Sequence, residues 1–186
     1  MKNTIKYLIL LIIYLVCGVN LQAQNYTFRN VVMSDGLSGL LVNAIYKDSE
    51  GFVWLGTDNC LDRFDGVKVR HYEFRGVDSG RKKRVNCITE TADNQLWVGN
   101  GIGLWRLNRA NGQLERIVPE KIDFAVNTLL PDGDILYIGT EKGLFIQKDG
   151  QLLQVLTDRN MLAACNRIMD LCLNEDKSAL WLATVQ

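Results

Sequence analysis

The residues with the clearest capacity for chemistry are acidic side chains near the start of the chain, namely Asp48, Glu50, Asp62 and Asp65. A pair of carboxylates at a suitable separation can supply the acid and the nucleophile or base of glycoside hydrolysis. Acidic residues recur at corresponding positions further along, at Asp93, Asp132 and Asp176. Because aspartate side chains bond to the backbone of tight turns, turn formation explains most of these residues better than catalysis.

A single histidine, His71, limits the other catalytic options. It excludes a metal site built from several histidines, and any histidine-dependent triad would have to use this residue. No serine or cysteine stands at a spacing from which a partner can be inferred, so we expect His71 to lie on the surface of a strand. The glycines of residues 99–103 precede no expected helix and therefore do not form a phosphate-binding loop. The sequence predicts no catalytic residue, no metal site and no cofactor.

The densest group of charges is basic and comprises Arg81, Lys82, Lys83 and Arg84. Loops on a rigid scaffold often carry binding residues, so this group is a candidate basic lip for an acidic or sulphated saccharide. A solvated loop end is the simpler interpretation. The whole chain has 21 Lys and Arg residues against 21 Asp and Glu residues, which gives no formal net charge. This balance argues against contact with nucleic acid, because nucleic-acid-binding domains are usually basic.

The first 23 residues are typical of a secretory signal peptide. Two lysines precede an apolar run, residues 7–17, which is too short for a membrane span of about 20 residues. Ala23 provides a small residue before a cleavage site, so we expect the protein to be exported and the mature chain to begin at Gln24. A retained anchor and a lipoprotein attached through Cys17 are the alternatives.

Four cysteines follow this segment, namely Cys60, Cys87, Cys165 and Cys172. They form no Cys-x-x-Cys pair and lack the spacing of a zinc site. We expect them to be small buried apolar residues. Since export would permit disulfides, a bridge between Cys165 and Cys172 is the alternative.

The remaining chain, residues 24–186, is organised by a repeat of about 43 residues, with units at residues 42–74, 85–118, 126–157 and 168–186. Each unit has an aromatic anchor, at Trp54, Trp97, Tyr137 and Trp181. Two positions later the first three units have a glycine, at Gly56, Gly99 and Gly139. Positions that recur in phase are a strong sign of a repeat architecture. We expect the anchors in the core, with each glycine allowing another backbone to approach closely.

Each unit is expected to form four short strands, which in the first unit are residues 42–47, 52–57, 60–64 and 67–74. The third and fourth strands are joined at Asp65-Gly66, Asn111-Gly112 and Asp149-Gly150 in successive units. These dipeptides tolerate the positive φ angles of tight hairpins. Four strands in about 43 residues is the size of a β-propeller blade. The sequence therefore predicts an all-β fold of about 3.5 blades of four antiparallel strands, in an incomplete ring.

The first unit closely resembles the two-component regulator propeller repeat. An Asp35-Gly-Leu-Ser38 lead-in precedes it, and Trp54-Leu-Gly-Thr57 and Asp65-Gly66 follow the usual pattern. The resemblance extends over nearly all of the mature chain. Cys60 stands where that pattern has a glycine, so we expect the turn there to be strained or reshaped. Ala183 is a second departure, because it replaces the glycine of the fourth unit.

The resemblance implies a role in signal transduction. In that family the repeats form the periplasmic sensor region of hybrid two-component systems, in which oligosaccharide binding drives a phosphorelay and the transcription of polysaccharide-use genes. The expected role is thus an N-terminal fragment of a ligand-sensing ectodomain without kinase chemistry or catalysis of its own. Its expected partners are an oligosaccharide, the remaining propeller blades and, as in full-length relatives, a second copy. The alternatives are a structural or protein-interaction propeller segment and the front end of a propeller enzyme.

Overall fold

The computed structural model describes residues 5–7, 28–77, 83–117, 120, 122–156 and 167–185. The chain divides into two compact units, residues 1–30 and residues 31–186. In the first unit residues 5–7 are helical, and the expected cleavage site after Ala23 lies outside the described residues. Among the described residues, no helix has both the length and the apolar character needed to cross a membrane. All strands among the described residues belong to the second unit.

The second unit consists of antiparallel sheets whose strands lie in chain order. Blade 1 contains β1 (Val42–Lys47), β2 (Val53–Thr57), β3 (Leu61–Phe64) and β4 (Val69–Tyr72). Blade 2 contains β5 (Val85–Glu90), β6 (Leu96–Asn100), β7 (Gly103–Asn108) and β8 (Gln113–Ile117). Blade 3 contains β9 (Val126–Asp132), β10 (Ile135–Thr140), β11 (Gly143–Lys148) and β12 (Gln151–Leu156). A two-stranded sheet, which we call half-blade 4, contains β13 (Arg167–Leu173) and β14 (Leu180–Val185).

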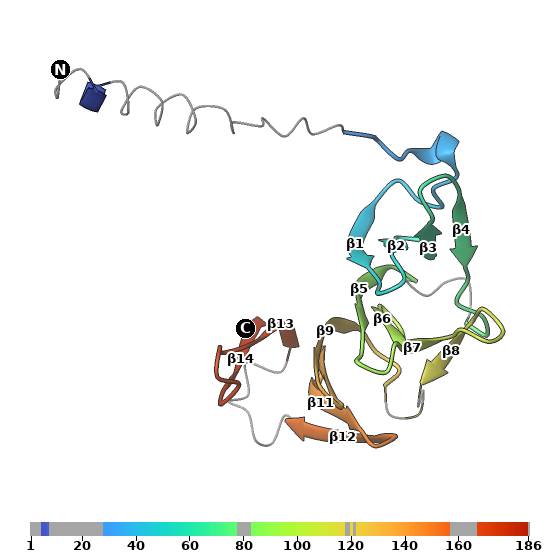
Figure 1. Ribbon diagram of the computed structural model, residues 1–186. Helices are drawn as coiled ribbons and strands as arrows, with labels where there is room; N and C mark the ends of the chain where they lie inside the picture. Colours follow the sequence, from blue (N-terminus) through green and yellow to red (C-terminus); the bar gives the residue numbers. More distant parts are fainter. Residues whose placement is uncertain are drawn as a thin grey trace. The chain divides into compact units, whose positions relative to one another are not determined.

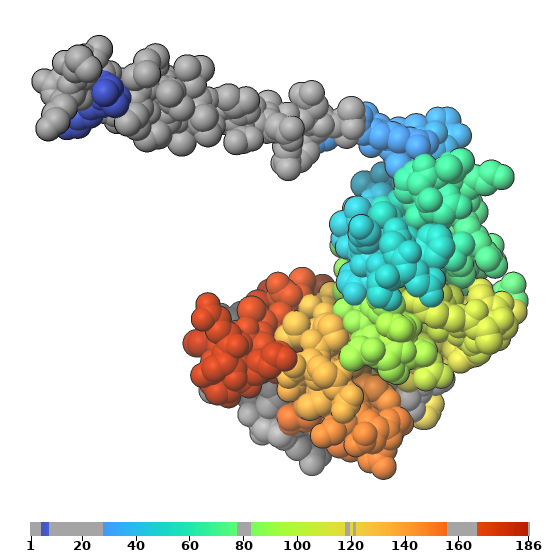
Figure 2. Space-filling view, in the orientation of Figure 1, coloured from blue at the N-terminus to red at the C-terminus, as the bar shows by residue number. Residues whose placement is uncertain are grey.

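Successive sheets meet through their first strands, so that β1 contacts β5, β5 contacts β9 and β9 contacts β13. The sheets follow one another in chain order, and the ring that they begin is not closed (Figure 1). The space-filling view shows the same succession, from cyan through green and orange to red (Figure 2). The prediction of an all-β fold built from four-stranded propeller blades in an incomplete ring is confirmed.

The glycine of each repeat lies where the next blade packs against it. A Cβ atom added at these glycines would approach a side chain of the following blade, at 2.4 Å for Gly56 and Val85, 2.6 Å for Gly99 and Val126, and 2.7 Å for Gly139 and Ile168. The three partners are completely buried, and each lies near the start of its blade's first strand. The close approach is therefore made by a β-branched side chain of the next blade, whereas the sequence suggested a backbone.

Polar contacts between blades repeat with the same period. The side-chain amide of Asn86 donates to the carbonyl of Val126 at 2.9 Å, and that of Asn127 donates to the carbonyl of Ile168 at 2.8 Å. Blades 1 and 2 are joined in addition by Arg109, whose guanidinium lies 3.0 Å from the Glu50 carboxylate. Each blade is thus held to the next by buried apolar packing and by specific hydrogen bonds.

The acidic residues of blade 1 that could suggest catalysis are occupied by structural contacts. Asp48 accepts hydrogen bonds from the indole of Trp54 and from the backbone of Phe52, both at 2.8 Å. Asp65 accepts the backbone N–H groups of Lys68 and Val67, and these bonds lower the pKa of its carboxyl. Both arrangements fit the turn roles inferred from the sequence.

The turn between β2 and β3 differs from its counterparts. Gly103 and Gly143 begin β7 and β11 with φ angles of 147° and 115°. Cys60 is not among the described residues with a positive φ angle, and β3 begins one residue later, at Leu61. The hydroxyl of Thr57 holds this turn by donating to the Cys60 carbonyl at 2.9 Å and accepting its N–H at 3.0 Å. The turn is therefore reshaped without a strained backbone at Cys60.

The four aromatic anchors lie in different environments. Trp54 and Trp97 are buried, Tyr137 is half-buried, and the side chain of Trp181 is 67% exposed. The expectation that all four are core residues is therefore wrong for Trp181. Its place in β14 corresponds to that of Trp97 in β6, but within the described part of the chain no third strand pairs with β14.

Gly99→Ala is expected to lower the free energy of unfolding by about 1–3 kcal/mol, the usual cost of overpacking a core. The added methyl group would meet Cys87 Sγ at 2.4 Å as well as Val126. Urea denaturation followed by tryptophan fluorescence measures the loss. In a double-mutant cycle, Val126→Ala should cost less in the Gly99→Ala background than in the wild type, because it makes room for the methyl group. Strictly additive costs would contradict the contact.

Candidate functional site

The basic group proposed from the sequence is only partly within the described structure. Arg81 and Lys82 lie outside the described residues. Lys83 is half-buried and Arg84 is exposed, immediately before β5. The backbone carbonyl of Arg84 accepts the N–H of Gly101 at 3.1 Å, which ties this segment to the β6–β7 turn. Neither side chain lines the two clefts described below.

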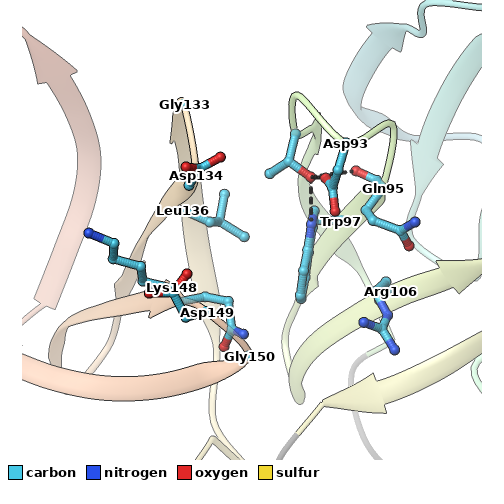
Figure 3. A pocket seen from close by; sticks show the side chains of 12 residues that line it. Asp93, Gln95, Trp97, Arg106, Gly133, Asp134, Leu136, Lys148, Asp149 and Gly150 are labelled. Carbon is cyan, nitrogen blue, oxygen red and sulfur yellow. Dashed lines mark hydrogen bonds between the residues drawn. The ribbon is translucent and has the colours of Figure 1, made fainter.

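A cleft of about 280 Å³ lies between blades 2 and 3, and we call it the interblade cleft. Blade 2 contributes Thr91, Asp93, Gln95, Trp97 and Arg106. Blade 3 contributes Gly133, Asp134, Leu136, Gln147, Lys148, Asp149 and Gly150 (Figure 3). Most of these residues belong to the turns that join β5 to β6, β9 to β10 and β11 to β12, or lie beside those turns. The cleft is thus built by the same turns that the repeat places at one end of each blade.

One wall of the interblade cleft is ordered by a chain of hydrogen bonds from Trp97. Its indole N–H lies 3.1 Å from the hydroxyl of Thr91, which in turn donates to the carboxylate of Asp93 at 2.6 Å (Figure 3). The guanidinium of Arg106 lies 5.8 Å from the centre of a Trp97 ring. The side-chain oxygen of Gln147 is buried and has no hydrogen-bond partner among the described residues. The cleft combines carboxylates, amides and cations with one aromatic ring.

These groups suit a ligand with many hydroxyl groups. Carboxylates accept hydrogen bonds, Arg and Lys donate them, and side-chain amides do both. Pockets that bind small ligands typically place a few such groups on a concave surface beside apolar or aromatic side chains. Sequence reasoning assigned Trp97 to the core, and it gave no sign of the cleft, because the cleft arises only where turns from two blades meet.

A second cleft, of about 370 Å³, lies beside β4, and we call it the His71 cleft. Its walls include Arg70, His71, Tyr72, Glu73 and Arg75 from blade 1 and residues 111–114 from blade 2. Strand residues alternate between the two faces of a sheet, so His71 points to the face opposite Arg70 and Tyr72. His71 thus lines this cleft, and its side chain lies on the face of blade 1 opposite Arg70 and Tyr72.

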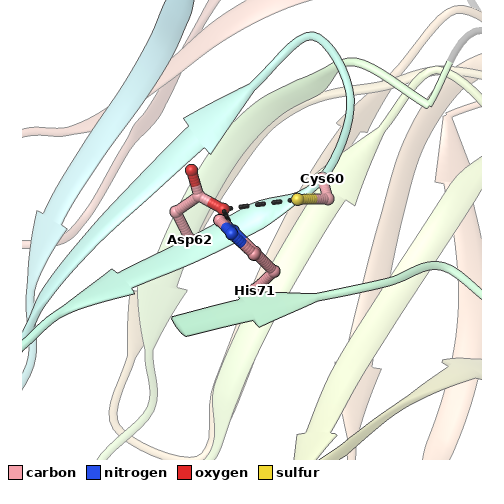
Figure 4. A group of neighbouring side chains, drawn as sticks. All are labelled: Cys60, Asp62 and His71. Carbon is pink, nitrogen blue, oxygen red and sulfur yellow. Dashed lines mark hydrogen bonds and ion pairs between the residues drawn. The ribbon is translucent and has the colours of Figure 1, made fainter. Parts of the chain in front are cut away.

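On that face His71 joins Cys60 and Asp62 in a compact polar cluster (Figure 4). Asp62 Oδ1 lies 2.7 Å from His71 Nδ1 and accepts the Cys60 thiol hydrogen at 3.3 Å. The other carboxylate oxygen, Asp62 Oδ2, accepts the backbone N–H of Ser38 at 2.8 Å. The Asp35-Gly-Leu-Ser38 lead-in is thereby tied to β3. Sequence spacing did not reveal this cluster, because His71 and Asp62 become neighbours only through the pairing of β3 with β4.

The cluster lacks the arrangement of a cysteine nucleophile. A nucleophilic cysteine needs a base that takes its proton. Here the Cys60 thiol is directed at Asp62 Oδ1, and His71 Nδ1 is bonded to the same carboxylate oxygen. Burial, together with the negative charge of Asp62, raises the pKa of the Cys60 thiol to about 12. Because the thiolate is the reactive form, this thiol is inert toward acyl transfer at neutral pH.

The other cysteines within the described residues are also free thiols. Cys87 lies in β5 and pairs with Gly99 of β6. Burial raises the pKa of its thiol to about 12. Cys172 is exposed on β13. Cys165, the alternative disulfide partner of Cys172, lies outside the described residues. The expected burial is thus confirmed for Cys60, is only partial for Cys87, which is half-buried, and is wrong for Cys172.

The repeated four-stranded antiparallel sheets define this chain as a segment of a β-propeller. Residues 36–59 match the family model described as Two component regulator propeller. The chain therefore carries this repeat in its first unit, and the resemblance inferred from the sequence is confirmed.

Known proteins show the same relationship over parts of their length. Histidine kinase P4 of Formosa agariphila is 32% identical over 79 residues, which are 42% of this chain and 6% of that protein. The extracellular domain of BT4673 from B. thetaiotaomicron, described as a hybrid two component system, superposes with a TM-score of 0.67 at 23% identity, over 80% of this chain and 21% of that chain. PorZ, a surface component of the type-IX secretion system of Porphyromonas gingivalis, gives a TM-score of 0.66 at 17% identity, over 88% of this chain and 27% of that chain. At these identities the solved structures share the fold, and this chain spans only a small part of each relative.

Proposed function

We propose that this chain forms part of a sensory propeller in a hybrid two-component signalling protein, and that it senses its ligand outside the cytoplasm. The observation that carries the proposal is the two component regulator propeller repeat at residues 36–59, in a chain that resembles a histidine kinase over 79 residues. In this role the segment binds and transmits, and the phosphorelay chemistry belongs to other parts of the protein.

The proposed location is the periplasm. The basic residues and apolar run at the N-terminus are typical of a secretory signal. The structural relative BT4673 is represented by its extracellular domain, which supports the same side of the membrane. In the full-length signalling protein we propose an inner-membrane anchor and a homodimer.

The proposed ligand is an oligosaccharide, and the proposed site within this chain is the interblade cleft. Its carboxylates Asp93, Asp134 and Asp149 and its cation Arg106 can hydrogen-bond to hydroxyl groups from two blades at once. A ligand that contacts both blades would stabilise their relative position. We propose that this change in blade position is transmitted to the other domains of the signalling protein. The remaining blades complete the ring on which this signal depends.

Calorimetric titration of the gene product at its full encoded length with neutral, acidic and sulphated oligosaccharides tests the proposal. We expect one class to bind, and Arg106→Ala or Asp149→Ala to weaken that binding by roughly tenfold or more, as loss of a charged hydrogen bond does. Glu175→Gln, on the exposed β13–β14 turn, is the matched control and should leave the affinity unchanged. Failure of every saccharide to bind would refute the ligand class, and unchanged affinity in both cleft variants would refute the site.

A further inference from the structure

We propose that Cys60, Asp62 and His71 form a binding site for a divalent metal ion of the zinc class. Nothing in this proposal depends on the sensory function, because the cluster shares no residue with the interblade cleft. Four features of blade 1 favour such a site: the face that the three side chains share, their supporting hydrogen bonds, their place in the repeat, and their donor atoms.

All three side chains lie on one face of one hairpin. Cys60 and Asp62 are two residues apart and so point to the same side of the chain. Asp62 and His71 are direct cross-strand partners in the β3–β4 ladder. One donor atom from each residue, Sγ, a carboxylate oxygen and a ring nitrogen, lies within 4.8 Å of the others.

The distances are close to those that a bound ion requires. Zinc bonds of about 2.0–2.3 Å in a tetrahedron place neighbouring donor atoms roughly 3.5 Å apart. Here the separations from Asp62 Oδ1 are 2.7 Å to His71 Nδ1 and 3.3 Å to Cys60 Sγ. Small side-chain rotations would therefore open the cluster around an ion, and the backbone of the hairpin would stay in place.

Supporting hydrogen bonds already orient two of the three ligands. Ser38 N–H holds Asp62 Oδ2, which leaves Oδ1 directed at the other two side chains. Thr57 fixes the backbone of Cys60 from both its N–H and its carbonyl. Partners of this kind, one step out from the ligands, are a regular feature of protein metal sites because they fix the orientation of the ligating groups.

At the centre of the cluster, a carboxylate replaces a buried aromatic side chain of the other blades. Asp62 corresponds to Trp105 in blade 2 and Phe145 in blade 3, both buried. Cys60 takes the place of Gly103 and Gly143, which begin the third strands. A completely buried carboxylate is costly unless it is fully bonded. Blade 1 thus places a carboxylate and a thiol where the other blades have an aromatic ring and a glycine, and both groups converge with His71 in space.

The donor set selects the kind of ion. Thiolate and imidazole favour zinc and related transition metals over calcium and magnesium, which prefer oxygen ligands. On binding, the ion replaces the thiol hydrogen, which leaves as a proton to solvent. With Cys60 as thiolate, Asp62 as carboxylate and neutral His71, the two negative charges balance the ion. The side chain of His71 is 48% exposed and lines the His71 cleft, which gives the ion an entrance and leaves a fourth position for water.

Titration of the full chain with Co²⁺, a spectroscopic substitute for zinc, tests the site. We expect a thiolate-to-cobalt charge-transfer band in the near ultraviolet that saturates at ~1 ion per chain and is abolished by Zn²⁺. Cys60→Ser should remove the band, and His71→Gln should weaken binding by at least tenfold, as loss of metal-site groups does. Because the His71 side chain is half-exposed, we expect His71→Gln to fold, so a loss of binding in this variant reports on the site itself.

Cys172→Ser and Cys87→Ser are the matched controls, since both thiols lie outside the cluster, and both should keep the band. Absence of a band in the wild type would overturn the proposal. So would a band that persists in Cys60→Ser or disappears in either control, because the ion would then be held by other cysteines.

Discussion

Replacing Trp97 with alanine is expected to lower the free energy of unfolding by about 3–5 kcal/mol, the usual cost of removing a large buried aromatic. Trp97 is 6% exposed and packs in a cluster with Leu104, Val126 and Leu136, so its loss opens a cavity between blades 2 and 3. Its indole N–H also binds Thr91 at 3.1 Å, and alanine would leave that hydroxyl without its donor. Both effects act in the same direction.

The chain contains its own control for this prediction. Trp181 stands at the equivalent repeat position, but 67% of it is exposed, so Trp181→Ala should cost below about 1 kcal/mol. Chemical denaturation of both variants under identical conditions, at low protein concentration, gives the comparison. If both variants lost the same free energy of unfolding, the prediction would be wrong, because the loss is expected to depend on the burial of each tryptophan.

Self-association of residues 24–186 is the second large effect that we expect. At one end of the blade series, 45% of Val42 and 72% of Ile45 are exposed. Their equivalents in blade 2, Val85 and Ile88, are buried against the preceding blade. At the other end, Trp181 is exposed on the two-stranded half-blade 4. Each end thus presents one half of an interface that occurs between blades elsewhere in the chain.

Two unlike and complementary ends favour head-to-tail association of separate copies. Exposed apolar strand edges strengthen this tendency. We therefore expect multi-angle light scattering to show an average mass that rises with protein concentration. Ile45→Lys and Trp181→Lys should each lower that mass, because each places a charge on one of the two ends.

Val67→Lys is the matched control, since Val67 is equally exposed but lies in the turn between β3 and β4. It should leave the average mass unchanged. A single monomeric species at all concentrations would contradict the prediction, and so would an equal effect of all three lysine substitutions.

The amino-acid sequence by itself determined the architecture of the blades. Trp54, Trp97 and Tyr137 recur in phase with a glycine two positions later, and this period is the size of one blade. Strand alternation and the Asp-Gly and Asn-Gly turns are local properties, so strand bounds such as Val42–Lys47 follow from neighbouring residues alone. Even the reshaped turn at Cys60 was visible as a departure from the pattern.

Only the tertiary structure decided which residues meet. Asp62 and His71 belong to one cluster because β3 and β4 pair in a register that puts them opposite each other. The interblade cleft exists because turns from two different blades lie side by side. Trp181 occupies the same aromatic position of the repeat as Trp97, yet it is exposed, because burial depends on the neighbouring strands and sheets. The repeat pattern determines which side chains of each blade are apolar, and the packing of neighbouring blades determines which of these side chains are buried.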